Sequence, residues 1–190
     1  MLKQNENVSL SMNYAEYITA VKTEGVLLTK KLIAIVAFLT LFAAGTWAMC
    51  GGIVNMPPCE LLVIGVCGIG YFIVSSNLNV EYEYIVASAQ VEFDAVYSHK
   101  KRKEILTVSL DNVERIAPAN KENMSYITSK SFAKTYDFCS SKKSKRRYFM
   151  TVKKGTENTL IYFDAIAKTL DVLKFFRSNI VEIDKEIYDM

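Results

Sequence analysis

The sequence has few of the residues that carry catalytic and metal chemistry. Its 190 residues include one histidine, His99, and four cysteines, none of them in a C-x-x-C pair. A structural zinc site and a dithiol redox motif are therefore not indicated. His99 lies in a basic run, where a solvated turn residue is a better interpretation than the base of a Ser-His-Asp or Cys-His arrangement.

Glycine is also scarce, and it forms no phosphate-binding loop. Gly65, Gly68 and Gly70 make a G-x-x-G-x-G pattern, but they lie in an apolar run and have the wrong order for a nucleotide loop. Close packing of helices is the natural use of these residues.

Acidic residues alternate with aromatic ones in two neighbouring segments, with Glu81 and Glu83 in the first and Glu92 and Asp94 in the second. Carboxylates that meet across two strands suit a metal ion or an acid-base pair. Lysine and arginine are abundant nearby, so a solvent-facing strand surface is the better interpretation. We accordingly expect no enzymatic activity, no cofactor and no bound metal.

The formal net charge is only +3, which by itself indicates no nucleic-acid partner. One strongly basic segment has aromatic neighbours, Tyr148 and Phe149, a combination that some nucleic-acid-binding proteins use. These aromatics begin a predicted strand, so we expect them in the core. The segment is kept as a secondary basic patch, made of Lys142, Lys143, Lys145, Arg146 and Arg147.

Charge is absent from two long stretches, Leu32 to Cys59 and Leu61 to Val80, which only Glu60 separates. A helix rises about 1.5 Å per residue, so about 20 apolar residues cross the roughly 30 Å hydrocarbon core. Both stretches meet this length, which predicts spans at about 32–55 and 61–80. The remaining chain is too small and too polar to cover such a hairpin in a soluble protein.

Basic residues flank the predicted hairpin, and the linker 51–59 has none. Lys22, Lys30 and Lys31 precede the first span, and Lys100 to Lys103 follow the second. The positive-inside rule then places both termini in the cytoplasm of a multi-pass protein of the cell membrane. A cleaved signal peptide is the competing interpretation, but its apolar core is normally shorter and closer to the N-terminus.

Several small or polar residues lie within the predicted spans. In an antiparallel hairpin, Tyr71 faces Gly45 or Thr46 and Ser76 faces Thr40. The alternative is that these hydroxyls bond to carbonyls of their own helix. Neither span contains an ionisable side chain, so a channel or transporter is not expected.

Two further features near the hairpin leave alternatives open. Cys50 and Cys59 flank the linker and are either bridged or free apolar thiols. In residues 1–31, Tyr14, Tyr17, Ile18 and Val21 recur at helical spacing and predict an amphipathic helix. This helix would lie on the membrane surface or against the C-terminal domain.

From Val80 onward the pattern changes to strands. Alternating, aromatic-rich segments predict six or seven antiparallel strands, beginning with VEYEYIVA and QVEFDAVY and including ILTVSL, AKTYDFCS, RRYFMTVKK and NTLIYF. The segment after Phe163 predicts a helix capped by Asp164, with an apolar face formed by Ile166, Leu170, Leu173, Phe176 and Ile180. This α+β plan is that of the pleckstrin-homology (PH) superfold, over residues 81–180, with an acidic tail at 181–190.

The chain also resembles a known family. The apolar hairpin, the strand pair EYEYIVASAQVEFDAVY, the basic turn HKKRK, the segment ILTVSLDNVERIAP and the later YDF, YFMTVKK and LIYF segments are similar to those of small, uncharacterised bacterial membrane proteins. The resemblance implies a two-helix transmembrane hairpin followed by a PH-like cytoplasmic domain. It implies no catalytic residue, and a fold does not by itself define a function.

This plan predicts a membrane-anchored, non-enzymatic binding module. The strand that starts at Val80 runs away from the membrane, and the next strand, Gln90 to Tyr97, runs back. Lys100, Lys101, Arg102 and Lys103 would then reach anionic lipid head groups. The alternative is a solvated turn whose charges prevent edge aggregation.

The partner is predicted to be anionic lipid, a protein, or both. A function of another class is a structural or accessory subunit, which a membrane complex would recognise through the hairpin.

Overall fold

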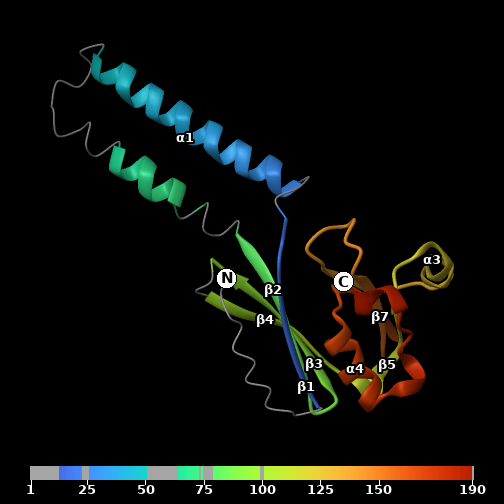
Figure 1. The fold of residues 1–190 in the computed structure, drawn as a ribbon. Coiled ribbons are helices and arrows are strands. Elements are labelled where there is room, and N and C mark those ends of the chain that lie inside the picture. Colours follow the sequence, from blue (N-terminus) through green and yellow to red (C-terminus); the bar gives the residue numbers. More distant parts are fainter. Residues whose placement is uncertain are drawn as a thin grey trace. The chain divides into compact units, whose positions relative to one another are not determined.

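The computed structural model describes residues 13–22, 26–50, 64–72, 74, 79–98 and 101–189 (Figure 1). Its contacts divide the chain into two compact units. One, here the domain unit, contains Met1–Thr19, Tyr82–Ala95 and Lys103–Met190. The other, here the apolar unit, contains Ala20–Glu81 and Val96–Arg102.

The first sheet has four strands in the order β1-β2-β3-β4. They are β1 (Tyr14–Ala20), β2 (Val80–Ala87), β3 (Gln90–Tyr97) and β4 (Lys101–Ser109). Strands β2 and β3 have the predicted bounds, because alternation of aromatic and β-branched residues is strong in both. The turn between them places Ser88 and Ala89 at positive φ, 51° and 59°.

The second sheet also has four strands, in the order β5-β7-β8-β6. They are β5 (Val113–Pro118), β6 (Lys134–Phe138), β7 (Arg147–Lys154) and β8 (Glu157–Asp164). Pairing is antiparallel between β5 and β7 and between β7 and β8, whereas β6 pairs with β8 in parallel. A short helix, α3 (Lys121–Thr128), connects β5 to β6.

The C-terminal part of the domain unit is helical. Helix α4 (Ala167–Phe176) buries Leu170 and Leu173, as its predicted apolar face requires. Short 3-10 turns follow, η2 (Ser178–Ile180) and η3 (Lys185–Asp189). The segment expected to be an acidic tail packs on the domain, because Val181 and Ile187 are buried in its core.

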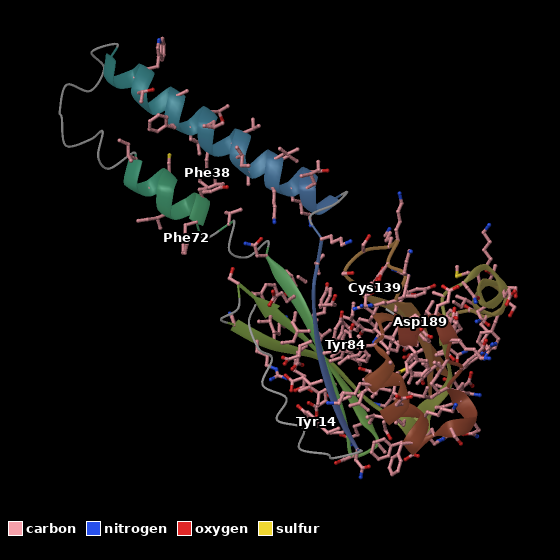
Figure 2. The ribbon with its side chains drawn as sticks, viewed as in Figure 1. Tyr14, Phe38, Phe72, Tyr84, Cys139 and Asp189 are labelled. Carbon is pink, nitrogen blue, oxygen red and sulfur yellow. The ribbon has the colours of Figure 1, made fainter. Side chains whose placement is uncertain are left out.

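Aromatic rings form much of the core of the domain unit. Phe93 stacks on Phe138 at 4.8 Å between ring centroids, and Tyr84 and Phe163 contact the same cluster. Tyr84 lies among the packed side chains (Figure 2). The rings come from both sheets, so this cluster holds the two sheets together.

Three predictions about the domain were wrong. The segment Tyr14–Ala20 is a strand rather than an amphipathic helix, because its burial alternates, with Ala15 and Thr19 inside. Of the seven strands described from Val80 onward, β6 and β8 pair in parallel rather than antiparallel, and β1 brings the described total to eight. Asp164 ends β8 and is buried, whereas Ile166 occupies the N-cap position of α4.

The apolar unit contains helix α1 (Val26–Cys50) and a second helical segment at 64–72. Within α1, Leu28–Ala48 has the length and composition to cross a membrane, with a mean hydropathy of 1.8. It is the one such helix in the described part of the chain. The second predicted span includes residues outside that part.

For the side chains that the structure describes, the contacts favour the alternative to pairing across the hairpin. Tyr71 lies edge-on to Phe38, at 5.8 Å, rather than opposite Gly45 or Thr46. Thr40 and Thr46 donate to carbonyls of their own helix, which satisfies their hydroxyls without a partner helix. Ser76 and the disulfide question at Cys50 and Cys59 lie outside the described side chains. Gly70 does permit close packing, because a Cβ there would lie 2.9 Å from the ring of Phe38.

Candidate functional site

The basic turn between β3 and β4 is the first candidate site. Lys101, Arg102 and Lys103 are the first residues of β4, and all three are exposed. His99 and Lys100 lie outside the described residues. Before the turn, Ser98 has a positive φ of 50°, and its N–H donates to the carbonyl of Asn79 at 3.0 Å.

That hydrogen bond places the basic turn beside the point where the apolar segment leaves and re-enters the sheet. The N–H of Val21 donates to the carbonyl of Val80 at 3.1 Å. Lys31, in the first turns of α1, donates to the side-chain oxygen of Asn79 at 2.9 Å. We call this paired base of the insertion the stem, residues 20–22 and 79–81. A cavity of about 190 Å³ opens here, lined by Ala20, Val21, Asn79, Val80, Glu81 and Ser98.

The secondary basic patch separates into two kinds of residue. Arg147 binds both carboxylate oxygens of Asp137, at 3.0 and 3.3 Å, and lies 4.2 Å from the ring centre of Tyr162. Arg146 donates to the hydroxyl of Tyr17 at 3.2 Å. These arginines therefore hold the fold together. The three lysines of the patch, Lys142, Lys143 and Lys145, are exposed, and Tyr148 and Phe149 lie in the core as predicted.

Asp164 is the centre of a buried polar cluster that the sequence did not reveal. Its side chain is only 2% exposed, and its Oδ2 accepts from the hydroxyl of Thr19 at 3.2 Å and from the N–H of Ser140 at 2.7 Å. Its backbone carbonyl accepts from the hydroxyl of Tyr84. The cluster thus joins strand β1 of the first sheet to β8 and to the loop after β6.

Two reactive side chains of this cluster are held in their neutral forms. Burial raises the pKa of the Tyr84 hydroxyl, and the nearby charge of Asp164 raises it further. Burial also raises the pKa of the Cys139 thiol, which more than offsets the opposing effect of Arg147. A thiol with a raised pKa is a poor nucleophile at neutral pH, so the environment of Cys139 is that of a structural cysteine.

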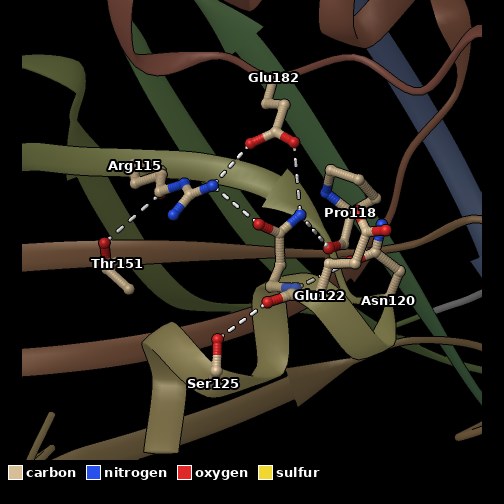
Figure 3. Close-up of polar contacts among 8 residues, drawn as sticks. Arg115, Pro118, Asn120, Glu122, Ser125, Thr151 and Glu182 are labelled. Atoms are coloured by element: carbon tan, nitrogen blue, oxygen red, sulfur yellow. Dashed lines mark hydrogen bonds and ion pairs between the residues drawn. The ribbon is translucent and has the colours of Figure 1, made fainter. Parts of the chain in front are cut away.

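A second polar network fixes α3 and the C-terminal segment to β5 (Figure 3). Arg115 donates to Asn123 and to Glu182, both at 2.7 Å. The amide of Asn123 donates in turn to the carbonyl of Pro118 at 3.2 Å. The ring of Tyr126 lies under both Arg115 and Lys130, 4.8 and 4.5 Å from its centre. These charges interact with one another, so we assign the network a structural role.

The carboxylates of β2 and β3 do not form the expected solvent-facing surface. Glu83 and Asp94 are buried, at 6% and 5% exposure, while Glu92 is exposed. Their neighbours Tyr84 and Phe93 are buried too, so both faces of the two strands are covered at these positions. Within the described residues, no group of three or more histidine, cysteine or acidic side chains is placed to hold a metal ion.

Two four-stranded sheets followed by a C-terminal helix define a PH-like domain of the α+β class. The chain belongs to the family described as Bacterial PH-like domain (DUF6106), whose model matches residues 11–182. No curated protein and no solved structure gives a significant match. The predicted bacterial PH-like family is thereby confirmed. PH-like domains commonly bind lipids or proteins and are typically not catalytic.

The buried hydroxyl and thiol generate a prediction about pH. Raised pKa values in the folded state mean that the folded protein holds these protons more tightly than the unfolded chain does. Their contribution to stability is therefore complete below about pH 8, and it is lost as the pH rises past the unfolded values of about 8.5 and 10. We expect the free energy of unfolding to fall between pH 8 and 11.

Urea unfolding at several pH values checks this expectation. Tyr84→Phe should lower stability by about 1 kcal/mol at pH 7, through loss of its hydrogen bond, but should flatten the decline above pH 9. Cys139→Ala tests the contribution of the thiol by itself, because only this variant should flatten the decline in the free energy of unfolding below pH 9. A pH dependence identical to that of the parent in both variants would contradict the assignment.

Proposed function

We propose that this protein is a membrane-anchored, non-enzymatic binding module, with a transmembrane hairpin inserted between β1 and β2 of its PH-like domain. The observation that carries the proposal is the hydrogen bond from Val21 to Val80, which closes the stem around residues 22–79. Strand pairing continues on the domain side of this bond, because β1 and β2 are neighbours in the sheet.

The surface of α1 supports insertion into a membrane. None of the residues Leu28–Ala48 is buried, and large side chains such as Leu39 and Trp47 are 62% and 75% exposed. Apolar residues lie on every side of the helix, which is typical of a membrane span rather than of a helix on the surface of a soluble domain. Its 21 residues have a length of about 30 Å, which matches the hydrocarbon core.

The stem supports two spans rather than one. Val21 and Val80 are hydrogen-bonded, so both lie on the same side of any membrane. The chain between them must then cross an even number of times. If α1 crosses the membrane once, the second crossing must be made by the second apolar run, residues 61–80, in which 64–72 are helical.

Strand β1 argues against a cleaved signal sequence. It precedes α1, and it contributes Ala15 and Thr19 to the interior of the domain. Tyr17 packs against the ring of Tyr84 at 5.4 Å. Cleavage after α1 would break the link between this strand and the sheet that it completes.

Anionic lipid head groups are the ligand that we assign to the basic turn. The turn is hydrogen-bonded to the stem through Ser98 and Asn79, and the stem leads directly into α1. Each lysine or arginine near an anionic surface contributes about 1 kcal/mol. An acidic protein partner would be bound by the same charges, and the liposome experiment below separates the two.

A groove in the apolar unit favours the second candidate, an accessory subunit recognised through the hairpin. This groove of about 350 Å³ lies between α1 and the helical segment 64–72. Phe38, Phe42, Cys67 and Tyr71 are among its lining residues. Replacing the hairpin with an unrelated one would abolish partner binding only under this second function.

The first prediction from the stem is that the hairpin can be removed. Replacing residues 22–79 by an Asn-Gly turn joins two strands that already pair, and this dipeptide suits such a turn. We expect a folded domain that needs no detergent, as judged by gel filtration and circular dichroism. A control that deletes 1–79, and with it β1, should aggregate. Insolubility of the Asn-Gly variant would contradict the insertion model.

The second prediction concerns topology. In a background with Cys50→Ser and Cys59→Ser, a membrane-impermeant maleimide applied to intact cells should label Asn55→Cys but not Lys121→Cys, an exposed position in α3. Cys139 is a poor reporter because it is buried, so it can stay in the protein. Lys121→Cys must become reactive after permeabilisation. Labelling of Lys121→Cys in intact cells would overturn the model with both termini inside.

The third prediction concerns the basic turn. In the hairpin-deleted domain, changing Lys100, Lys101, Arg102 and Lys103 together to Gln should weaken binding to acidic liposomes by up to about 4 kcal/mol. Binding should also weaken with salt and be absent on neutral liposomes. The matched control changes four exposed lysines elsewhere, Lys121, Lys134, Lys154 and Lys168. Equal loss in both variants would mean that only net charge matters, and no loss would exclude the turn.

A further inference from the structure

We infer that the loop between β6 and β7, residues 139–146, is a second contact for anionic lipid head groups, held in place by strand β1. The inference rests on the proposed membrane anchor, but it concerns a different part of the chain from the basic turn. Its basis is the way in which the loop is fastened.

Both ends of the loop are fixed to β1 through long-range hydrogen bonds. At one end, the N–H of Ser140 donates to Oδ2 of Asp164, which also accepts from Thr19 of β1. At the other end, the guanidinium of Arg146 donates to the hydroxyl of Tyr17, again on β1. The loop is therefore attached to the strand that precedes α1 in the chain.

Hydrogen bonds between residues of the loop also order its backbone. The N–H of Lys143 donates to the hydroxyl of Ser141, and that of Arg146 donates to the hydroxyl of Ser144, both at 3.2 Å. Serine side chains that accept from the backbone two residues on are typical of tight turns. These hydrogen bonds therefore set the local shape of the backbone, while the lysines of the loop are exposed.

The exposed charge of this loop is positive. Lys142, Lys143 and Lys145 are exposed, and the described residues give them no ion pair. The acidic residues close by are engaged elsewhere, since Asp137 binds Arg147 and Asp164 is buried. An acidic surface is the complement of such a loop.

The membrane is the acidic surface that the loop's attachment favours. Thr19, to which the loop is tied through Asp164, is seven residues from the start of α1 at Val26. Those residues span at most about 25 Å, which bounds the distance from Thr19 to the first residue of α1 and favours the membrane over a free acidic partner. A tether of this kind gives a high effective concentration of head groups, and three lysines are then sufficient for a contact.

Hydrogen–deuterium exchange on the full chain in nanodiscs tests the inference. We expect the peptide containing 139–146 to exchange at least threefold more slowly in discs of phosphatidylglycerol and phosphatidylcholine than in discs of phosphatidylcholine alone. The difference should disappear at 0.5 M salt and in the variant Lys142→Gln, Lys143→Gln, Lys145→Gln. The matched control, Lys121→Gln, Lys154→Gln, Lys168→Gln, removes the same charge from exposed positions and should retain it.

The same samples distinguish failure of this inference from failure of the proposed function. Slow exchange of residues 28–48 in every disc reports the membrane anchor. If these residues are protected but 139–146 exchange equally in both lipids, the loop contact is wrong and the anchor stands. If residues 28–48 exchange freely, the anchor itself is wrong. Protection of the loop that survives in the triple-lysine variant would also overturn the inference, because it would not depend on these charges.

Discussion

The pairing of β1 with β2 is the interaction on which the rest of the structure depends. These two strands are neighbours in the sheet, yet residues 22–79 separate them in the chain. Closing a flexible loop of that length costs about 4 kcal/mol of entropy by a logarithmic estimate. In the proposed anchor, a pair of helices that formed first in the membrane would bring the two chain ends together and remove most of that cost. The proposed anchor is therefore also a reason why β1 reaches its place.

The cluster around Asp164 explains why β1 stays in the domain although a long insertion follows it. A buried carboxylate is costly unless hydrogen bonds satisfy it, and here Thr19 and Ser140 supply two of them. Arg146 and Tyr17 add a further link between β1 and the loop after β6. Side chains from β1, β2, β8 and this loop thus meet at one place.

How far the sequence could predict this structure varied with the strength of the local pattern. Strands β2 and β3 were predicted to the residue, because alternation is clear and Ser88-Ala89 separates them. Strand β1 was mistaken for a helix, since Ala15 and Thr19 conceal its buried face and the tyrosines happen to recur at helical spacing. Strand β5 was missed because it is short and ends in Pro118. Asp164 fits the rule for an N-cap residue, and only the tertiary contacts with Thr19 and Tyr84 show that it ends a strand instead.

The candidate site could be predicted only in part, for a physical reason. A run of basic residues has the same composition whether its members face solvent or hold the fold together, and the choice depends on partners far away in the chain. Arg147 is bound to Asp137 and lies over Tyr162, whereas the neighbouring Lys145 is exposed.

In the proposed anchor, the stem also reduces the binding energy that the basic residues have to supply. A domain on a single flexible linker can turn freely, so a few lysines would have to supply both attachment and orientation. In the proposed anchor, two chain segments hydrogen-bonded at Val21 and Val80 would leave a tethered domain less rotational freedom than one flexible linker does. The basic residues then need only select among the remaining orientations, for which differences of 1 or 2 kcal/mol are enough. Modest positive charge on an anchored domain is consequently consistent with a specific orientation, although the same charge on a free domain would give only marginal binding.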